Sequence, residues 1–144
     1  MLLFKNGRFH RNGASFMLPN NFYLDTDPDA EIEGLMAWSS NKMIHIELGL
    51  DEETVDAKTS FEDYFEKGSG LDIQVRSTMV PTIVNGLEGY QAYYASNGAA
   101  FVEYRLELPK GGIMWIMFEQ KGASLQELQK SEVVATMLKE IRRE

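Results

Sequence analysis

The chain has 144 residues, of which 44% are hydrophobic and 25% are charged, as is typical of a globular protein. Its 22 acidic residues outnumber the 14 Lys and Arg residues, and the formal net charge of −8 argues against binding to nucleic acids and anionic lipids, which require clustered positive charge. There is no Cys, so disulfides and thiolate chemistry are excluded.

The length and the even composition predict a single domain over residues 1–144. No apolar run approaches the roughly 18 to 20 residues that span a bilayer, so membrane insertion is not expected. The N-terminal MLLF lacks the positively charged start and the longer apolar stretch of a signal peptide. We therefore expect a cytoplasmic protein, unless a leader has been removed.

The N-terminal third holds short extended segments: RFHRN, SFML, FYLDT, EIEGLMAWSS and KMIHIELGL. In the last of these, apolar residues alternate with a second set of side chains, so we predict a strand with one buried and one polar face. The predicted buried face is Ile44, Ile46, Leu48 and Leu50, and the other is Met43, His45, Glu47 and Gly49. The SSNK segment before this strand predicts a hairpin turn.

The segment DTDPDAEIE, residues 25–33, partly resembles a calcium-binding EF-hand loop. Asp25, Asp27 and Asp29 occupy its first three ligand positions. However, Ala30 stands where the loop requires glycine, and Met36 stands where it requires its final bidentate glutamate. The segment therefore favours an acidic turn over a calcium site, and we expect no metal and no cofactor.

Two helices are predicted from capping boxes, in which a Ser or Thr is followed three residues later by Glu. The first begins at Thr59 with Glu62, and its apolar stripe is Phe61, Tyr64 and Phe65. The second begins at Ser124 with Glu127 and continues to the end of the chain. Its apolar stripe is Val134, Met137, Leu138 and Ile141, and Lys139, Arg142 and Arg143 are expected in its final turns.

A strand-rich region lies between these helices. It consists of LDIQVRSTMV, LEGYQAYYAS, AAFVEYRLEL and GIMWIMFEQ, of which the last three are separated by Asn97-Gly98 and by the turn segment 109–112. GIMWIMF is apolar on both faces, so we expect it at the centre of the sheet. The short connections predict an α+β fold in which helices pack on an antiparallel sheet.

Three segments in this order resemble the Mog1/PsbP-like superfamily. SFMLPNNF, residues 15–22, is similar to its phe-x-x-pro-x-gly-phe/trp element, although asparagine stands at 20 and 21 where glycine is common. TSFEDYF, residues 59–65, resembles its first helix, and VNGLEGYQAYY, residues 84–94, its gly-x-x-gly/ala strand entry. The resemblance implies an α/β/α sandwich and a binding or accessory role, since relatives include a small-GTPase-binding transport factor and photosystem accessory proteins.

No catalytic motif accompanies these segments. The chain contains neither a G-x-S-x-G elbow nor a Gly-rich phosphate loop, and His10 and His45 are too few for a histidine-rich zinc site. Nothing in the sequence therefore requires an enzyme. The expected function is a non-enzymatic protein-binding or accessory domain.

The candidate binding residues are polar side chains expected on one face of the sheet: Arg76, Tyr93, Glu103 and Arg105, with Glu107, His45 and Glu47 near them. One interpretation is cross-strand charge pairing without a ligand. The other is a surface for a protein partner, with Tyr93 as its aromatic anchor and with acidity that suits a basic partner. The alternative function is a small-molecule site or enzyme with a carboxylate pair, such as Glu47 and Glu103, between sheet and helix.

Overall fold

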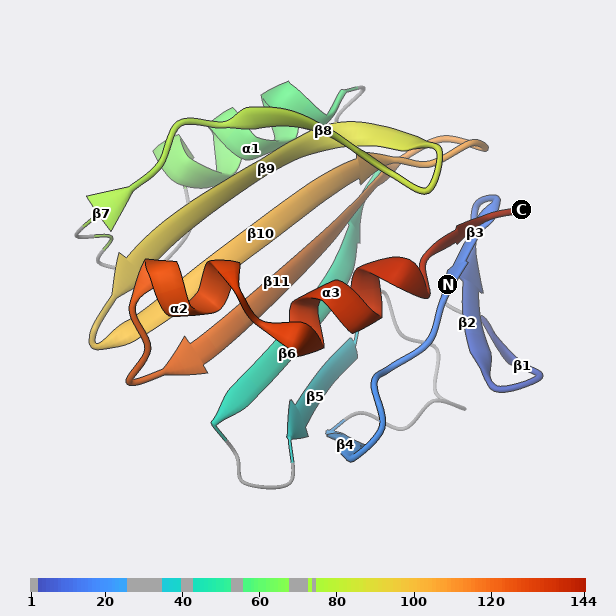
Figure 1. Cartoon of the computed structure of the whole chain (residues 1–144). Helices are drawn as coiled ribbons and strands as arrows, with labels where there is room; N and C mark the ends of the chain where they lie inside the picture. The colour runs from blue at the N-terminus through green and yellow to red at the C-terminus, as the bar shows by residue number, and fades with distance from the viewer. Residues whose placement is uncertain (1–2, 26–34, 40–42, 53–55, 68–72, 74) are drawn as a thin grey trace.

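The computed structural model describes residues 3–25, 35–39, 43–52, 56–67, 73 and 75–144. Most of the described chain forms antiparallel β-sheet, and helices pack on both faces of the larger sheet (Figure 1). The predicted α+β class with an antiparallel sheet is confirmed at this level. None of the helices in the described ranges is long and apolar enough to cross a membrane.

The larger sheet has the strand order β4-β5-β6-β11-β10-β9-β7, and β8 also pairs with β9. Its strands are β4 (Phe22–Leu24), β5 (Leu35–Ser39), β6 (Ile44–Asp51), β7 (Val75–Arg76), β8 (Val80–Val84), β9 (Leu87–Ser96), β10 (Ala99–Glu107) and β11 (Ile113–Lys121). β11 lies between β6 and β10, so the predicted central place of GIMWIMF is confirmed. The turn at Asn97 and Gly98 is also confirmed, and both residues have positive φ.

The smaller sheet joins the beginning and the end of the chain. Its strands are β1 (Leu3–Lys5), β2 (Arg8–Arg11), β3 (Ala14–Phe16) and β12 (Arg142–Arg143), in that order. Arg8, on β2, donates to the side chain of Ser15 at 3.1 Å and lies 3.3 Å from the Glu140 carboxylate. These contacts connect the first strands of the chain to its last residues.

One main core lies between the larger sheet and the two C-terminal helices, α2 (Leu125–Gln129) and α3 (Glu132–Lys139), which lie in front of the sheet in Figure 1. The smaller sheet contributes Phe9 and Phe16 to this core. Helix α1 (Ala57–Lys67) packs on the other face against β9 and β10. Phe61 is fully buried there, and Phe65 packs against Tyr94, as the predicted stripe requires.

The helices begin and end at residues that differ in part from those predicted from the sequence. Asp56, and not Thr59, caps α1, because its carboxylate accepts hydrogen bonds from the backbone N–H and hydroxyl of Thr59. These hydrogen bonds hold the pKa of Asp56 below its usual range. The capping box of Ser124 and Glu127 is confirmed. The single long C-terminal helix is wrong, since the chain breaks after α2 and begins α3 with Ser131 as a new cap.

Two strand predictions also need correction. LDIQVRSTMV is not one strand in the described part, because three residues, 77–79, oppose two residues of β9 and form a bulge between β7 and β8. Arg142 and Arg143 pair with β3 and do not continue the helix. On the face of β6 that was predicted to be polar, His45 and Gly49 are buried and Glu47 is partly exposed, so this face is less accessible than the predicted half-buried strand requires. Residues 40–42, in the predicted SSNK turn, lie outside the described residues.

The turn between β8 and β9 also supports α3. Asn85 has a φ of 48°, and its amide donates to the backbone oxygens of Leu138 at 3.0 Å and Ile141 at 2.7 Å. Carbonyls at the end of a helix lack partners within the helix, so this side chain satisfies them. The hairpin and the C-terminal helix thereby fix each other's position.

Candidate functional site

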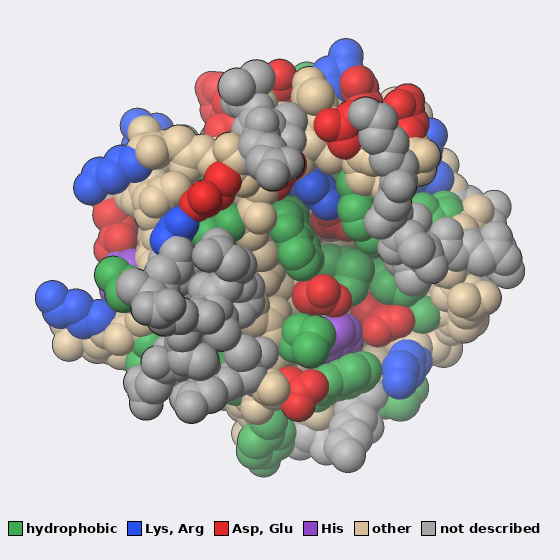
Figure 2. Space-filling model, turned by 180° about the vertical axis from the view of Figure 1, so that it is seen from behind, with side chains coloured by type: hydrophobic (Ala, Val, Ile, Leu, Met, Phe, Trp, Pro, Cys, Tyr) green, Lys and Arg blue, Asp and Glu red, His purple; other side chains and the backbone are tan. Residues whose placement is uncertain are grey.

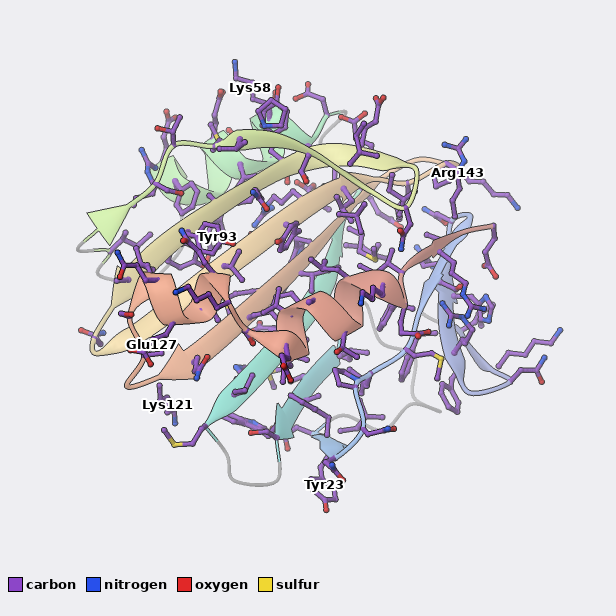
Figure 3. All side chains as sticks on the ribbon, in the orientation of Figure 1. Tyr23, Lys58, Tyr93, Lys121, Glu127 and Arg143 are labelled. Carbon is purple, nitrogen blue, oxygen red and sulfur yellow. The ribbon has the colours of Figure 1, made fainter. Side chains whose placement is uncertain are left out.

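Three of the four predicted binding residues share one face of the larger sheet, and the fourth lies on the opposite face. Arg76 pairs with Tyr94, which places it on the same face as Glu103 and Arg105, where α1 packs. Tyr93 pairs with Val102 and belongs to the face that carries α2, as Figure 3 shows. The predicted grouping of Tyr93 with the charged residues is wrong, because a shift of one residue along a strand reverses the face.

The three charged residues do not form one exposed surface. Glu103 and Arg105 are only 1% and 5% exposed and lie beneath α1. Arg76 is exposed, and its guanidinium lies 4.7 Å from the centroid of the Phe65 ring. A partner could therefore contact Arg76 but could not reach the buried pair.

Glu103 and Arg105 are the centre of a hydrogen-bonded network between α1 and the sheet. Arg105 Nε donates to Glu103 Oε2 at 2.7 Å, and its Nη2 lies 2.7 Å from the same oxygen. The hydroxyl of Tyr94 donates to Glu103 Oε1 at 3.0 Å. Arg105 Nη1 donates to the hydroxyl of Ser60 on α1, which in turn donates to Asp51 at 2.8 Å. The network ties the helix to β6, β9 and β10.

The surroundings of Glu103 determine whether it can act in the predicted carboxylate pair with Glu47. Burial raises the pKa of Glu103, while the adjacent Arg105 guanidinium and the Tyr94 hydroxyl act in the opposite direction. Glu47 lies on the same face two strands away, with Met117 between the two residues in the register, and its negative charge adds to the rise in the pKa of Glu103. Both oxygens of Glu103 already accept hydrogen bonds. Only Glu47, which is partly exposed, is accessible from solvent.

The same face has an open half beside α1. The helix packs on β9 and β10, and no helix of the described residues covers β5 and β6 on this side. Figure 2 shows acidic, hydrophobic and histidine side chains gathered in a hollow of this face. The register assigns six residues to this surface, which we call the open face: Met36, Trp38, His45, Glu47, Glu119 and Lys121.

An aromatic pair lies in the open face. The rings of Trp38 and His45 are stacked, with centroids 4.2 Å apart and planes inclined by 15°. Nδ1 of His45 lies 3.5 Å from the Glu119 carboxylate, and the ammonium of Lys121 lies 4.9 Å from the centroid of the Trp38 ring. His45 is 8% exposed, and its Nε2 has no hydrogen-bond partner among the residues that the structure describes. The surface thus combines two carboxylates, stacked rings and an unpaired nitrogen.

A second hollow lies on the same face at the other side of the sheet. It is open, has a volume of about 690 Å3, and is lined by Pro81, Thr82, Ile83, Glu88, Gly89, Tyr90 and Glu107. The Glu107 carboxylate also accepts a hydrogen bond from the backbone N–H of Ala57, at the start of α1. This hollow contains neither Glu47 nor Glu103, so it is not the predicted carboxylate pocket.

The calcium hypothesis falls largely outside the described residues. Asp27 and Asp29 belong to residues 26–34, which the structure does not describe. Asp25 is described, and its backbone N–H donates to the carbonyl of Met36 at 2.8 Å. Within the described ranges, no three His, Asp or Glu side chains are grouped so that they could hold a metal ion.

Some of the site residues could have been identified from the sequence, and others could not. His45 and Glu47 were placed correctly on the face opposite Ile44. Glu119 and Lys121 carry the same two-residue alternation within β11, but the proximity of Glu119 to His45 and of Lys121 to Trp38 depends on the strand order. Trp38, which is partly exposed at the open face, comes from β5 and pairs there with His45.

Comparisons with known proteins do not identify a family. No family model matches the chain, and no curated protein matches it. A solved structure from Bacteroides thetaiotaomicron VPI-5482 is similar over 92% of this chain and 45% of its own, with 8% sequence identity and a TM-score of 0.44. The chain therefore spans less than half the length of that protein.

Proposed function

We propose that the domain is a non-enzymatic binding module that holds a basic segment of a partner protein at its open face. The observation that carries this proposal is the position of Lys121. Its ammonium lies over the Trp38 ring, and Glu119 on the same strand contributes a carboxylate to this surface. The chain's own cation thus occupies a place where a cation of a partner could bind.

The physical chemistry of this surface favours positive ligands. An aromatic face attracts a cation within about 6 Å of its centroid, and the attraction increases when the cation is desolvated. Glu47 and Glu119 add negative charge on neighbouring strands, and the net charge of −8 attracts basic partners from a distance. The exposed Met36 and Met43, at 38% and 43%, supply adaptable apolar contacts for the stems of Lys and Arg side chains.

We also propose that the fold is a Mog1/PsbP-like sandwich. Helices on both faces of the larger sheet support it, as do the positions of the three resembling segments. TSFEDYF lies within α1, and the glycine-containing segment forms the turn into β9. Asn21, at a place where glycine is common in that family, has a φ of 66°, a conformation that glycine adopts readily. This resemblance agrees with a binding role.

Replacing Glu119 with glutamine is expected to weaken binding of a basic peptide by about threefold to tenfold, since it removes one carboxylate from the open face and keeps its shape. The measurement is fluorescence anisotropy of a labelled short peptide in which Lys and Arg alternate with Gly and Ser. A peptide with Glu at the same positions should not bind.

The matched control is Glu88→Gln. Glu88 is an exposed carboxylate on the same sheet face, but it lines the second hollow. The two variants have the same net charge, so only the position of the lost carboxylate differs. Equal weakening by both substitutions would contradict the open face as the binding site, and no binding of the basic peptide would contradict the proposed function.

Replacing Lys121 with methionine is expected to strengthen binding of the same peptide by about threefold, because it removes a cation that competes for the Trp38 ring. Lys58→Met is the matched control, since Lys58 is an exposed lysine on α1 that is 4.0 Å from Glu62. It changes the net charge equally but lies at the opposite side of the molecule from Lys121, as the two labelled lysines in Figure 3 show. An equal gain in both variants would indicate a general charge effect and not competition at the open face.

A further inference from the structure

We propose that the residue captured at the open face is arginine, not lysine. This inference deepens the proposed function and rests on it. It starts from a buried polar atom of the open face that has no hydrogen-bond partner among the described residues, Nε2 of His45. A ligand that completes this bonding must also suit the stacked rings and the two carboxylates beside it.

The position of Glu119 sets the hydrogen-bonding role of the histidine. Nδ1 of His45 is the ring nitrogen nearer to Glu119, at 3.5 Å, so the proton of a neutral ring is best placed on Nδ1, facing the carboxylate. Nε2 is then an acceptor. It is buried without a donor, and a buried acceptor without a partner costs free energy that a bound N–H group would recover. The required ligand is therefore a donor of hydrogen bonds.

The ring geometry distinguishes the two cationic side chains. A guanidinium is planar, stacks on aromatic rings, and presents five N–H donors that can reach carboxylates and a ring nitrogen together. An ammonium is a compact point charge with three donors and does not stack. Trp38 and His45 are nearly parallel, at 15°, and carboxylates of Glu47 and Glu119 lie on adjacent strands. This arrangement suits a flat ligand with donors along its edge.

Access to Nε2 requires a neighbouring side chain to move. The nitrogen is covered in the structure, but Trp38, whose ring stacks on His45, is partly exposed, and Lys121, whose ammonium lies over the Trp38 ring, is exposed at the end of β11. Displacement of the Lys121 ammonium by an incoming guanidinium would free the Trp38 ring face. Binding of an arginine at this surface therefore requires that the Lys121 ammonium leaves the Trp38 ring.

The test compares two labelled peptides that are identical except that one carries arginine and the other lysine at every cationic position. We expect the arginine peptide to bind at least about tenfold more tightly, the effect of one added charge-assisted hydrogen bond. His45→Phe keeps a ring against Trp38 but removes the acceptor. It should reduce the preference to less than about threefold, chiefly by weakening the arginine peptide.

The outcomes separate this inference from the function on which it rests. Equal affinity for the two peptides in the wild-type protein would overturn the arginine assignment and leave the basic-segment proposal standing. Binding of neither peptide would overturn the basic-segment proposal. Free Nα-acetyl-arginine amide that binds as tightly as the peptide would overturn the protein segment as the source. If His45→Phe does not fold by circular dichroism, His45→Gln, whose amide oxygen can accept, should retain the preference, and its loss would contradict the role of Nε2.

Discussion

Replacing Arg105 with methionine is expected to lower the free energy of unfolding by about 3–5 kcal/mol, the usual effect of removing one partner of a buried ion pair. The substitution leaves Glu103, which is 1% exposed, without its two contacts to the guanidinium. It also removes the hydrogen bond to Ser60 that ties α1 to the sheet. Urea unfolding followed by circular dichroism measures the loss.

The loss of stability in Arg105→Met depends on pH through Glu103. Burial already raises the pKa of Glu103, and removal of Arg105 takes away the largest opposing effect, so the pKa in the folded variant rises further. A carboxyl group whose folded pKa exceeds its unfolded pKa stabilises the fold below the unfolded value and loses that contribution as pH rises. The difference in the free energy of unfolding between the wild-type protein and Arg105→Met should therefore be smallest near pH 4, about the unfolded pKa of a glutamate. It should grow as the pH rises toward neutral.

Arg76→Met is the matched control for this prediction. Arg76 lies on the same sheet face and also contacts an aromatic ring, but it is exposed. Its loss should cost less than about 1 kcal/mol, as for other exposed cations. Comparable losses in the two variants would contradict a special role of the buried pair.

Replacing Gly89 with alanine is expected to cost about 3 kcal/mol or more, at the upper end of overpacking effects. A Cβ at this position on β9 would lie 1.9 Å from the backbone oxygen of Arg105 on β10. A backbone atom in a paired strand cannot move aside as a side chain can, so β9 and β10 would have to separate locally. The melting temperature and the urea midpoint should both fall.

Gly98→Ala provides the control with the same chemical change. Gly98 has a φ of +77° and no atom within 4 Å of the added Cβ, so only the conformational preference of alanine opposes it. A loss of about 1 kcal/mol is expected there. If Gly98→Ala were as damaging as Gly89→Ala, the clash with β10 would not explain the effect.

Local patterns in the sequence predicted most elements of the fold, because a strand, a turn or a helix cap depends mainly on residues that are close together in the chain. The strand AAFVEYRLEL, the Asn97-Gly98 turn and the capping box at Ser124 all correspond to observed features. The break between α2 and α3 was missed, although Ser131 is an evident cap, because the apolar stripe that predicted the helix begins at Val134 and carries no information about the residues before Ser131. The pairing of β12 with β3 was missed because it joins residues that are far apart in the chain.

The candidate site was predicted less well, since a site depends on register and strand order. Tyr93 and Tyr94 are equivalent by composition, and only the pairing with β10 shows that Tyr94 reaches Glu103. Glu103 and Arg105 were expected on an accessible face, but the position of α1 buries them. His45 and Glu47 could be placed on the correct face from β6 alone, yet their neighbours Trp38 and Glu119 come from two other strands.

The contact between Arg8 and Glu140 has a consequence for synthesis on the ribosome. The two residues are 132 positions apart, and β3 acquires β12 as its neighbour only through Arg142 and Arg143. During translation the first three strands must wait for almost the whole chain before the smaller sheet can close. The strands β2 and β3 can pair early, but the edge of β3 that faces β12 stays open until residue 143 has emerged, however early the larger sheet forms.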